Sequence, residues 1–146
     1  MDIRIVTQEN LKEVVPLFNA YREFYGQPSD LAGAEQFLTE RFTNRESIIF
    51  LASIHEQPVG FVQLYPSFSS VAMKKAFILN DLFVTAQARQ QGVAKSLIER
   101  CYVYCEEQNA RYITLETAVD NKNAQRLYEQ MEMQVDTTVL HYSKYW

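Results

Sequence analysis

The chain has 146 residues, of which 47% are hydrophobic and 13% aromatic, so it can bury a continuous core as one domain, residues 1–146, without disulfide bonds or a structural metal. Its formal net charge is −4 and no cluster of Lys or Arg is larger than the pair Lys74 and Lys75, so we expect no nucleic-acid partner. Residues 1–4 do not resemble a signal peptide, and no apolar run approaches the roughly 18 residues of a membrane span. We therefore expect a cytoplasmic protein that has no membrane contact.

The N-terminal residues predict a strand followed by a helix. Residues 3–6 alternate as an edge strand does, and Thr7 is a suitable cap for a helix that runs to about Tyr25. Pro16 falls inside this helix and lacks the N–H of a helical residue, so we expect it to bend or split the helix.

A second helix and a hairpin are predicted next. Ser29 or Asp30 can cap the helix, and residues 47–53 and 59–65 are apolar and β-branched runs separated by a short turn. Pro66–Ser70 breaks the strand pattern. Its composition fits either a loop that lines a substrate pocket or an ordinary turn.

The most informative stretch is residues 79–97, an apolar run that leads through a polar turn into an amphipathic helix, Gly92–Gln108. The first amides of a helix have no intrahelical acceptor and carry the positive end of its dipole, so they can bind a phosphate group. Gly92 would let a ligand approach the backbone closely, and the small Ala94 leaves room for packing. An ordinary strand-to-helix turn is the alternative.

The C-terminal part predicts a further strand, helix and hairpin. Residues 112–118 read as a strand, Asp120 or Asn121 as the cap of the last helix, and 133–139 and 140–145 as two closing strands. The element order predicts an α/β sandwich with a mixed, largely antiparallel sheet of about seven strands and about four helices.

The cysteines and histidines do not indicate a metal site. Cys101 and Cys105 are four residues apart on the predicted third helix, where packing is a better explanation than a strained local disulfide or an incomplete zinc site. His55 and His141 have no companions, so we expect no bound metal.

Two motifs in order carry a resemblance to a known family. The pattern V-x4-R-x-x-G-x-A followed by N-x-x-A-x-x-L-Y is similar to that of the GNAT superfamily of acetyl-CoA-dependent N-acetyltransferases, and with its flanking elements it covers nearly the whole chain. The residues that match are Val84, Arg89, Gly92, Ala94, Asn121, Ala124, Leu127 and Tyr128.

The resemblance implies a GNAT-like sandwich in which pantetheine lies between two splayed strands and acetyl-CoA is the co-substrate. The backbone of 82–84 is then expected to pair with pantetheine, the amides of 90–95 to hold the pyrophosphate, Arg89 to add or fix charge, and Asn121 to contact the cofactor arm. Asn121 can also serve as a helix cap. The expected cofactor-binding residues are Leu82, Phe83, Val84, Arg89, Gln90, Gln91, Gly92, Val93, Ala94, Lys95 and Asn121.

Tyr128 matches the tyrosine that protonates the leaving thiolate in many family members. A phenol with a pKa of about 10 can donate to a thiolate whose conjugate acid has a pKa of about 8.5. Its alternative is a packing role. Asn80 stands where polyamine-acetylating relatives often carry Glu, so the general base stays open among Asp81, Glu116 and solvent.

Other family features concern the acceptor and two replaced glycines. Aromatic residues of the first two helices flank the place where family members build the acceptor pocket: Tyr21, Phe24, Tyr25 and Phe42. Gln90 replaces the usual glycine after the arginine, and residues 129–133 lack the glycine and aromatic that usually follow Tyr128.

The combined expectation is acetyl transfer from acetyl-CoA to a primary amine, directly in a ternary complex. A small amine, amino acid or polyamine is preferred as the acceptor, and a homodimer is possible. The competing interpretation is a non-catalytic acyl-CoA-binding module that senses ligand or binds a partner.

Overall fold

The computed structural model describes all residues, 1–146, as two compact units, Met1–Glu116 and Thr117–Trp146. That the two units form a single domain remains a prediction.

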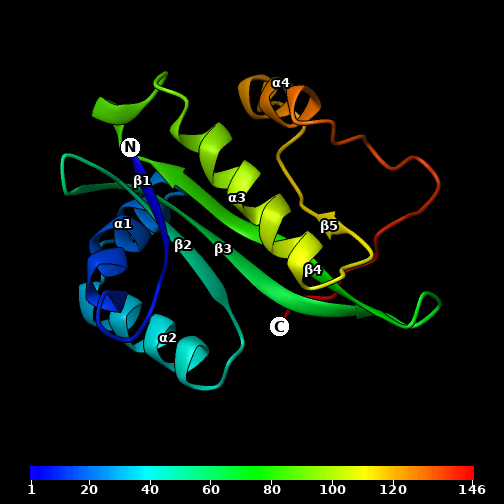
Figure 1. Cartoon of the computed structure of the whole chain (residues 1–146), viewed down its shortest axis with the longest axis horizontal. Coiled ribbons are helices and arrows are strands. Elements are labelled where there is room, and N and C mark those ends of the chain that lie inside the picture. The colour runs from blue at the N-terminus through cyan, green and yellow to red at the C-terminus, as the bar shows by residue number, and fades with distance from the viewer. The chain divides into compact units, whose positions relative to one another are not determined.

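The first unit is built on a five-stranded sheet with the order β1-β2-β3-β4-β5 (Figure 1). Neighbouring strands are antiparallel except β4 and β5, which run parallel. The mixed, largely antiparallel sheet is therefore confirmed, whereas the expected number of about seven strands is wrong. The strands are β1 (Asp2–Ile5), β2 (Ile48–Ile54), β3 (Gln57–Ser69), β4 (Lys74–Val84) and β5 (Ile113–Thr114).

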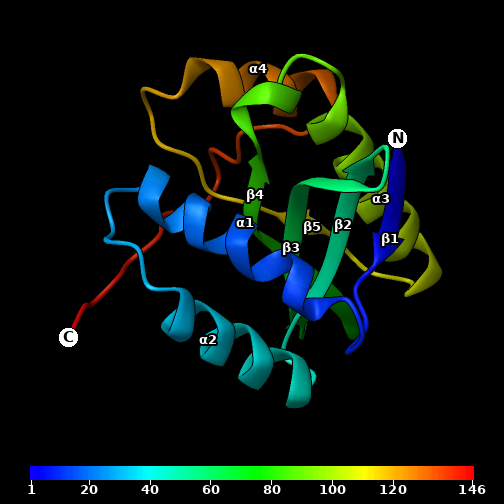
Figure 2. The same cartoon turned by 90° about the vertical axis from the view of Figure 1, so that its left-hand side faces the viewer.

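Three helices cover the two faces of this sheet (Figure 2). α1 (Leu11–Phe24) and α2 (Leu31–Thr43) pack on one face, and α3 (Val93–Glu107) packs on the other. Successive side chains of a strand point to opposite faces of the sheet, so both faces carry apolar residues. Leu51 and Phe61 belong to the core under α1 and α2. Phe50 and Phe77 contact Tyr104 of α3 on the other face.

The helix starts follow from local hydrogen bonds. α1 begins at Leu11, later than expected, because Thr7 donates its N–H to Asn10 Oδ1 at 2.6 Å in a preceding turn. The helix continues through Pro16 without a break, so Pro16 does not split it, and the alternative expectation of a bend stays a prediction. Asp30 caps α2, as expected, by accepting from the Gly33 N–H at 2.9 Å.

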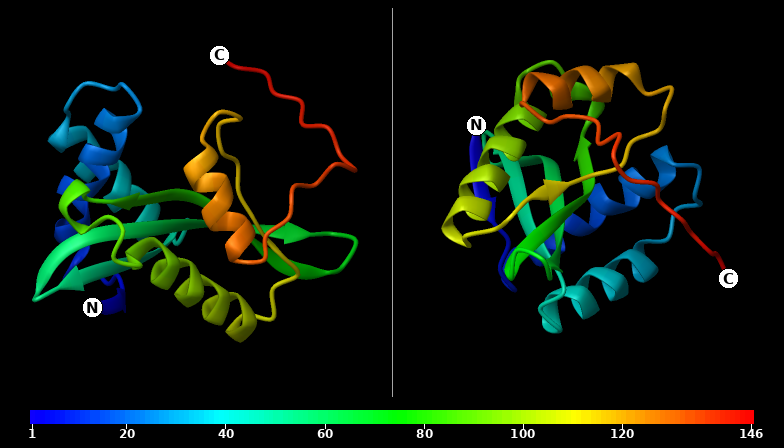
Figure 3. Two further views of the ribbon diagram at one scale, coloured as in Figure 1. Left: turned by 90° about the horizontal axis from the view of Figure 1, so that it is seen from above. Right: turned by 90° about the vertical axis from the view of Figure 1, so that its right-hand side faces the viewer.

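The β3–β4 ladder is longer than the sequence predicts. β3 continues through Ser69, so Pro66–Ser69 belongs to a strand and not to a loop, and the hairpin tip extends beyond α3 (Figure 3). Phe68 pairs with Lys75. Six residues of strand, about 20 Å, then separate Lys75 from Asp81, which argues against Phe68 as part of an acceptor pocket near Asp81.

The second unit contains one helix, α4 (Lys122–Gln130), and no strand. The expected closing strands at 133–139 and 140–145 are absent, and Val135 and Leu140 are 80% and 81% exposed. A strand needs a neighbour to satisfy its backbone groups, and this unit offers none. The strand expected at 112–118 is reduced to Ile113–Thr114, because only these residues pair with β4.

Candidate active site

β4 has an open edge over its C-terminal half. β5 pairs only with Phe77 and Ile78, so the residues from Leu79 to Val84 have no strand on that side within the first unit. On the other side the ladder with β3 continues to the Gly60–Val84 pair. The open backbone groups of β4 are thus available to an extended ligand.

Alternation decides which of these peptide groups face the open edge. The Thr85 N–H donates to the Val59 carbonyl at 2.8 Å, so Thr85 faces β3 and Val84 faces away from it. By the same alternation the Leu82 peptide groups face the open edge, while those of Phe83 face β3. Two of the three residues expected to pair with pantetheine, Leu82 and Val84, therefore present backbone groups there.

A β-bulge lies just before this edge. Leu64 pairs with Leu79 and Gln63 pairs with Asp81, which leaves Asn80 as an extra residue of β4. The bulge turns Asp81 toward the α1 side of the sheet, where it is 3% exposed. Bulges of this kind re-aim side chains next to active sites.

The turn after β4 exposes a row of unbonded amides. A short 3-10 turn, η1 (Ala86–Ala88), precedes Gln90 and Gly92, which have φ angles of 63° and 78°. The amides from Gln90 to Lys95 donate to no group within the protein, and the first turn of α3 carries no acidic side chain. A Cβ atom placed on Gly92 would meet nothing within 4 Å, so the space in front of this backbone is open. The turn fits a pyrophosphate group.

Arg89 holds this turn to the end of β4. Its Nε donates to the Val84 carbonyl at 3.2 Å, and its Cζ lies 5.8 Å from the centroid of the Phe24 ring. Arg89 therefore ties the turn to the end of β4 and places its guanidinium charge beside the Val84 carbonyl.

Asp81 is the centre of a buried polar cluster. Gln63, which is completely buried, donates its Nε2 to Asp81 Oδ2 and lies 3.3 Å from the Tyr65 hydroxyl. Asn80 Nδ2 donates to Asp81 Oδ1 at 3.0 Å, and the Tyr21 hydroxyl donates to the Asn80 carbonyl at 3.4 Å. Four side chains from α1, β3 and β4 thus surround one carboxyl group.

Burial changes the acid–base properties of this cluster. Desolvation raises the pKa of Asp81 above its usual range, although hydrogen bonds from Gln63, Tyr21 and Asn80 oppose the shift. Desolvation and the nearby Asp81 charge raise the pKa of Tyr65 to about 12 and also raise that of Tyr21. A carboxyl group with a raised pKa is a candidate for proton transfer.

Aromatic rings line the α1 side of the cluster. The Tyr21 ring meets the rings of Phe61 at 6.0 Å, Phe83 at 6.4 Å and Tyr25 at 5.0 Å in edge-to-face geometry. Tyr25 and Phe24 are 61% and 62% exposed. The rings therefore form a continuous row from the core to the surface.

Gln63 and Tyr65 are site residues that the sequence reasoning missed. Both lie in the apolar run that is predicted to be a strand. Because side chains alternate along a strand, they point to the same face of the sheet as Phe61. The sequence feature that points to them is Gln63 itself, a polar residue on an otherwise apolar strand face. A buried Gln needs hydrogen-bond partners, so polar neighbours are expected around it.

Asn121 and Tyr128 belong to the second unit. Asn121 caps α4 by accepting from the Ala124 N–H at 3.2 Å, which is the alternative role considered for it. Tyr128 lies on α4 and is half-buried. Their participation in the site remains a prediction. Glu116, the other candidate base, ends the first unit and is exposed.

The cysteines are free thiols. Cys101 is buried and Cys105 half-buried, and burial raises their pKa values to about 12 and about 11. Both thiols therefore stay protonated near neutral pH, as expected of packing residues. No three His, Cys, Asp or Glu side chains come together as a metal site, and none of the helices is both long and apolar enough to cross a membrane.

Comparison with known proteins agrees with this geometry. Residues 14–133 match the sequence model of the Acetyltransferase (GNAT) family. A Bacillus subtilis protein named uncharacterized N-acetyltransferase YhfO is 46% identical over 142 residues, which cover 97% of this chain and 95% of that protein.

Solved structures are also similar. The crystal structure of a probable acetyltransferase is 39% identical with a TM-score of 0.95, over 100% of this chain and 98% of the other. The structure of AAC(6')-Iy with a bisubstrate analogue that contains CoA shares the fold, with 22% identity and a TM-score of 0.80 over 99% and 98% of the two chains. The chain belongs to the GNAT family of acetyltransferases.

Proposed function

We propose that this protein transfers the acetyl group of acetyl-CoA to the nitrogen of a primary amine, directly within a ternary complex. The observation that carries the proposal is the open edge of β4 leading into the unbonded amides at the start of α3. The edge matches the extended pantetheine arm, and the amides match the pyrophosphate.

In this proposal the first unit provides most of the cofactor contacts. The backbone groups of Leu82 and Val84 pair with the pantetheine amides, while the amides from Gln90 to Lys95, with the charge of Arg89, hold the pyrophosphate. Asn121 contacts the cofactor arm in addition to capping α4. When bound, acetyl-CoA supplies the acetyl group as an activated thioester.

The chain's own groups then assist transfer. The Val84 N–H stabilises the negative charge that develops on the thioester oxygen. Asp81 accepts the proton of the amine through water, because three residues of strand, about 10 Å, separate it from Val84. Tyr128 protonates the departing sulfur. Burial raises the pKa of Asp81, which favours Asp81 over the exposed Glu116 as the base.

The acceptor in this proposal is a small amine, amino acid or polyamine. Asp81 offers a negative charge to an ammonium group, and the rings of Tyr21, Tyr25 and Phe24 offer faces that attract cations. The free thiols suit a reducing compartment, which supports a cytoplasmic location.

A homodimer is proposed as the assembly. Apolar side chains of the second unit are largely exposed in the single chain, among them Leu140 at 81% and Trp146 at 103%. Such surface is commonly covered by a partner. Light scattering coupled to gel filtration is expected to give twice the mass of one chain, and a mass of one chain would refute the dimer.

Acetyl-CoA binding tests the cofactor assignment. Ligand that binds only the native state stabilises it by about 2.7 kcal/mol at a hundredfold excess over Kd, so we expect a clear rise in Tm. Gly92→Val is expected to remove most of that rise, because its side chain enters the open space before the amides.

The ligand-dependent change in Tm separates this effect from backbone strain. Valine at a φ of 78° also lowers the Tm without ligand, so each protein is compared with itself in the presence and absence of acetyl-CoA. An unchanged rise in Gly92→Val would show that the pyrophosphate lies elsewhere.

A further inference from the structure

A hollow lies at the opposite end of the β3–β4 ladder from the proposed active site. It has a volume of about 810 Å³ and is formed by the first unit alone, between the end of α2, the start of β2, the hairpin end of β3 and β4, and Tyr104 of α3. This volume is within the range of small-molecule sites. Seven residues of β4, about 23 Å of strand, separate Phe77 in its lining from Val84.

The lining of this hollow is aromatic and cationic. Phe68, Phe77 and Tyr104 supply ring surface, and Arg45 and Lys75 supply positive charge. No Asp or Glu lines it, although the whole chain has a net charge of −4. The local charge is therefore opposite to the average charge of the protein.

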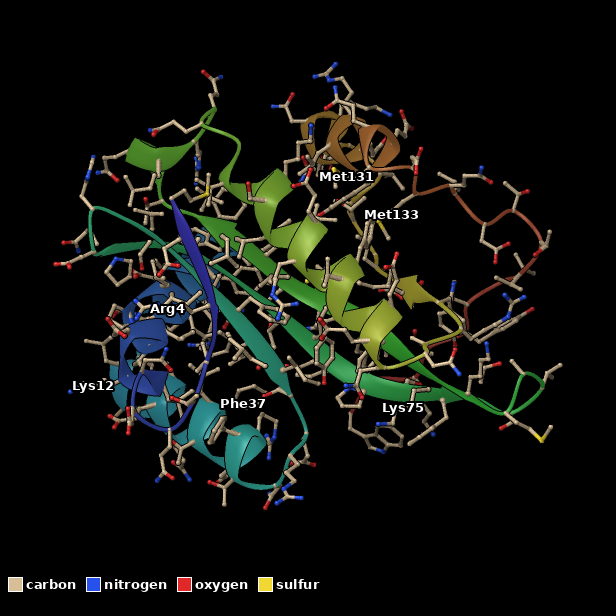
Figure 4. The ribbon with its side chains drawn as sticks, viewed as in Figure 1. Arg4, Lys12, Phe37, Lys75, Met131 and Met133 are labelled. Atoms are coloured by element: carbon tan, nitrogen blue, oxygen red, sulfur yellow. The ribbon has the colours of Figure 1, made fainter.

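The two cations have no acidic partner. Lys75 Nζ bonds the neutral Gln108 Oε1 at 3.1 Å, and the ion pairs of the structure involve neither Lys75 nor Arg45. Figure 4 shows Lys75 near the hairpin end of β4. An anion in the hollow would gain both charges without displacing an existing carboxylate.

A buried hydroxyl of the lining also lacks a partner. Ser47 Oγ makes no hydrogen bond within the protein. A buried donor without an acceptor is costly, and an anion that reaches the Ser47 hydroxyl would satisfy it.

We propose that this hollow is a second ligand site, which binds a small aromatic anion by stacking on Tyr104 and Phe68 and by charge-assisted hydrogen bonds from Lys75, Arg45 and the Ser47 hydroxyl. A carboxylate and a phosphate monoester share this chemistry. The inference does not depend on acetyl transfer, since no residue of the hollow belongs to the proposed active site.

Binding of defined probes to the intact chain tests the proposal. We expect benzoate or phenyl phosphate to shift the backbone amide resonances of Phe68, Phe77 and Tyr104 in nuclear magnetic resonance spectra. Benzylamine, an aromatic cation, tests whether the ligand must be negatively charged. Inorganic phosphate, an anion without a ring, tests whether the ligand must be aromatic. We expect neither compound to shift these resonances. The two aromatic anions together identify the preferred acid group.

Charge-removing variants provide the matched control. Lys75→Gln is expected to weaken binding at least tenfold, because a hydrogen bond to a charged group is worth about 1.5–3 kcal/mol. Lys12→Gln removes the same charge from α1, well apart from Lys75 in Figure 4, and is expected to leave the affinity unchanged.

Three results would overturn the proposal. They are equal binding of benzylamine, equal weakening by Lys12→Gln and Lys75→Gln, and the absence of shifts at Phe68, Phe77 and Tyr104 at 10 mM of either aromatic anion. Shifts that are confined to the amides at the start of α3 would also overturn the proposal, because they would show binding at the phosphate-binding turn and not in the hollow.

Discussion

At the residue scale, the turn before α3 depends on two left-handed backbone positions. Gly92 has a φ of 78° and adopts it without cost, while Gln90 has a φ of 63° with a side chain that disfavours it. The turn keeps its conformation although the usual glycine is replaced. Glu132, where the family pattern also has glycine, likewise has a φ of 65°.

This strain predicts that Gln90→Gly stabilises the protein. A left-handed residue with a side chain costs about 1–2 kcal/mol, and the greater freedom of glycine in the unfolded state offsets part of the gain. We expect a net rise of up to about 1 kcal/mol in the free energy of unfolding, measured with urea. Gln91→Gly is the control, since Gln91 has no positive φ, and is expected to destabilise; equal effects would refute the strain argument.

Asp81 is the residue whose burial should be visible in the pH dependence of stability. Its pKa in the folded protein lies above the unfolded value, so the folded state holds this proton more tightly. The contribution of Asp81 to the free energy of unfolding is fully present below the pKa that Asp81 has in the unfolded chain. It is lost as the pH rises through the pKa that Asp81 has in the folded protein.

Asp81→Asn therefore should gain stability relative to the parent protein as the pH rises. The amide cannot ionise, so the variant avoids the cost that the parent meets above the folded pKa of Asp81. Urea unfolding at pH 4 and pH 7 measures the difference. If the stability difference between the two proteins is the same at both pH values, Asp81 does not titrate as the burial indicates.

At the element scale, β4 is the element on which the site depends. Its β3 edge is paired to the end, its other edge is open from Leu79, and its bulge at Asn80 directs Asp81 to the α1 side. Gly60 allows this arrangement, because a Cβ atom there would lie 2.8 Å from the Phe83 carbonyl oxygen. The close approach fixes β4 next to Val84.

Gly60→Ala is expected to disturb this end of β4. Overpacking costs about 1–3 kcal/mol, and the atom that the new Cβ would meet is a backbone oxygen, which cannot rotate away. We expect a loss of stability in urea unfolding and a higher KM for acetyl-CoA, because the Val84 peptide groups move with the strand. A stable variant with unchanged KM would show that β4 does not need this contact.

Sequence patterns predicted the elements whose signals are local. The Asp30 cap, the hairpin of β2 and β3, and the glycine start of α3 all rest on residues close in sequence, and all are confirmed. The bulge at Asn80 and the cluster around Asp81 depend on the register between β3 and β4, which no local pattern fixes. The closing strands failed for the same reason, because alternation supplies no pairing partner.

At the scale of the whole molecule, the proposed chemistry requires groups from both units. Asp81, Val84 and most of the cofactor contacts belong to Met1–Glu116, whereas Tyr128 and Asn121 belong to Thr117–Trp146. The proposal thus predicts a division of roles, in which the first unit supplies the base and the oxyanion contact and Tyr128 supplies the proton for the departing sulfur, so that loss of the Tyr128 hydroxyl affects the rate.

Tyr128→Phe tests this division. The variant keeps the ring and loses the proton donor, so we expect kcat to fall about 10- to 100-fold while the affinity for acetyl-CoA changes little. Steady-state kinetics and direct binding measure the two quantities. Equal kcat in both proteins would assign Tyr128 to packing.

The most direct test of acetyl transfer is the release of free CoA thiol from acetyl-CoA with a panel of primary amines that includes small amines, amino acids and polyamines. Mass spectrometry of the products identifies the acetylated nitrogen. We predict release that depends on the amine and equals the amount of N-acetylated product. Binding of acetyl-CoA without amine-dependent release for any member of the panel would contradict the account and favour a non-catalytic acyl-CoA-binding module.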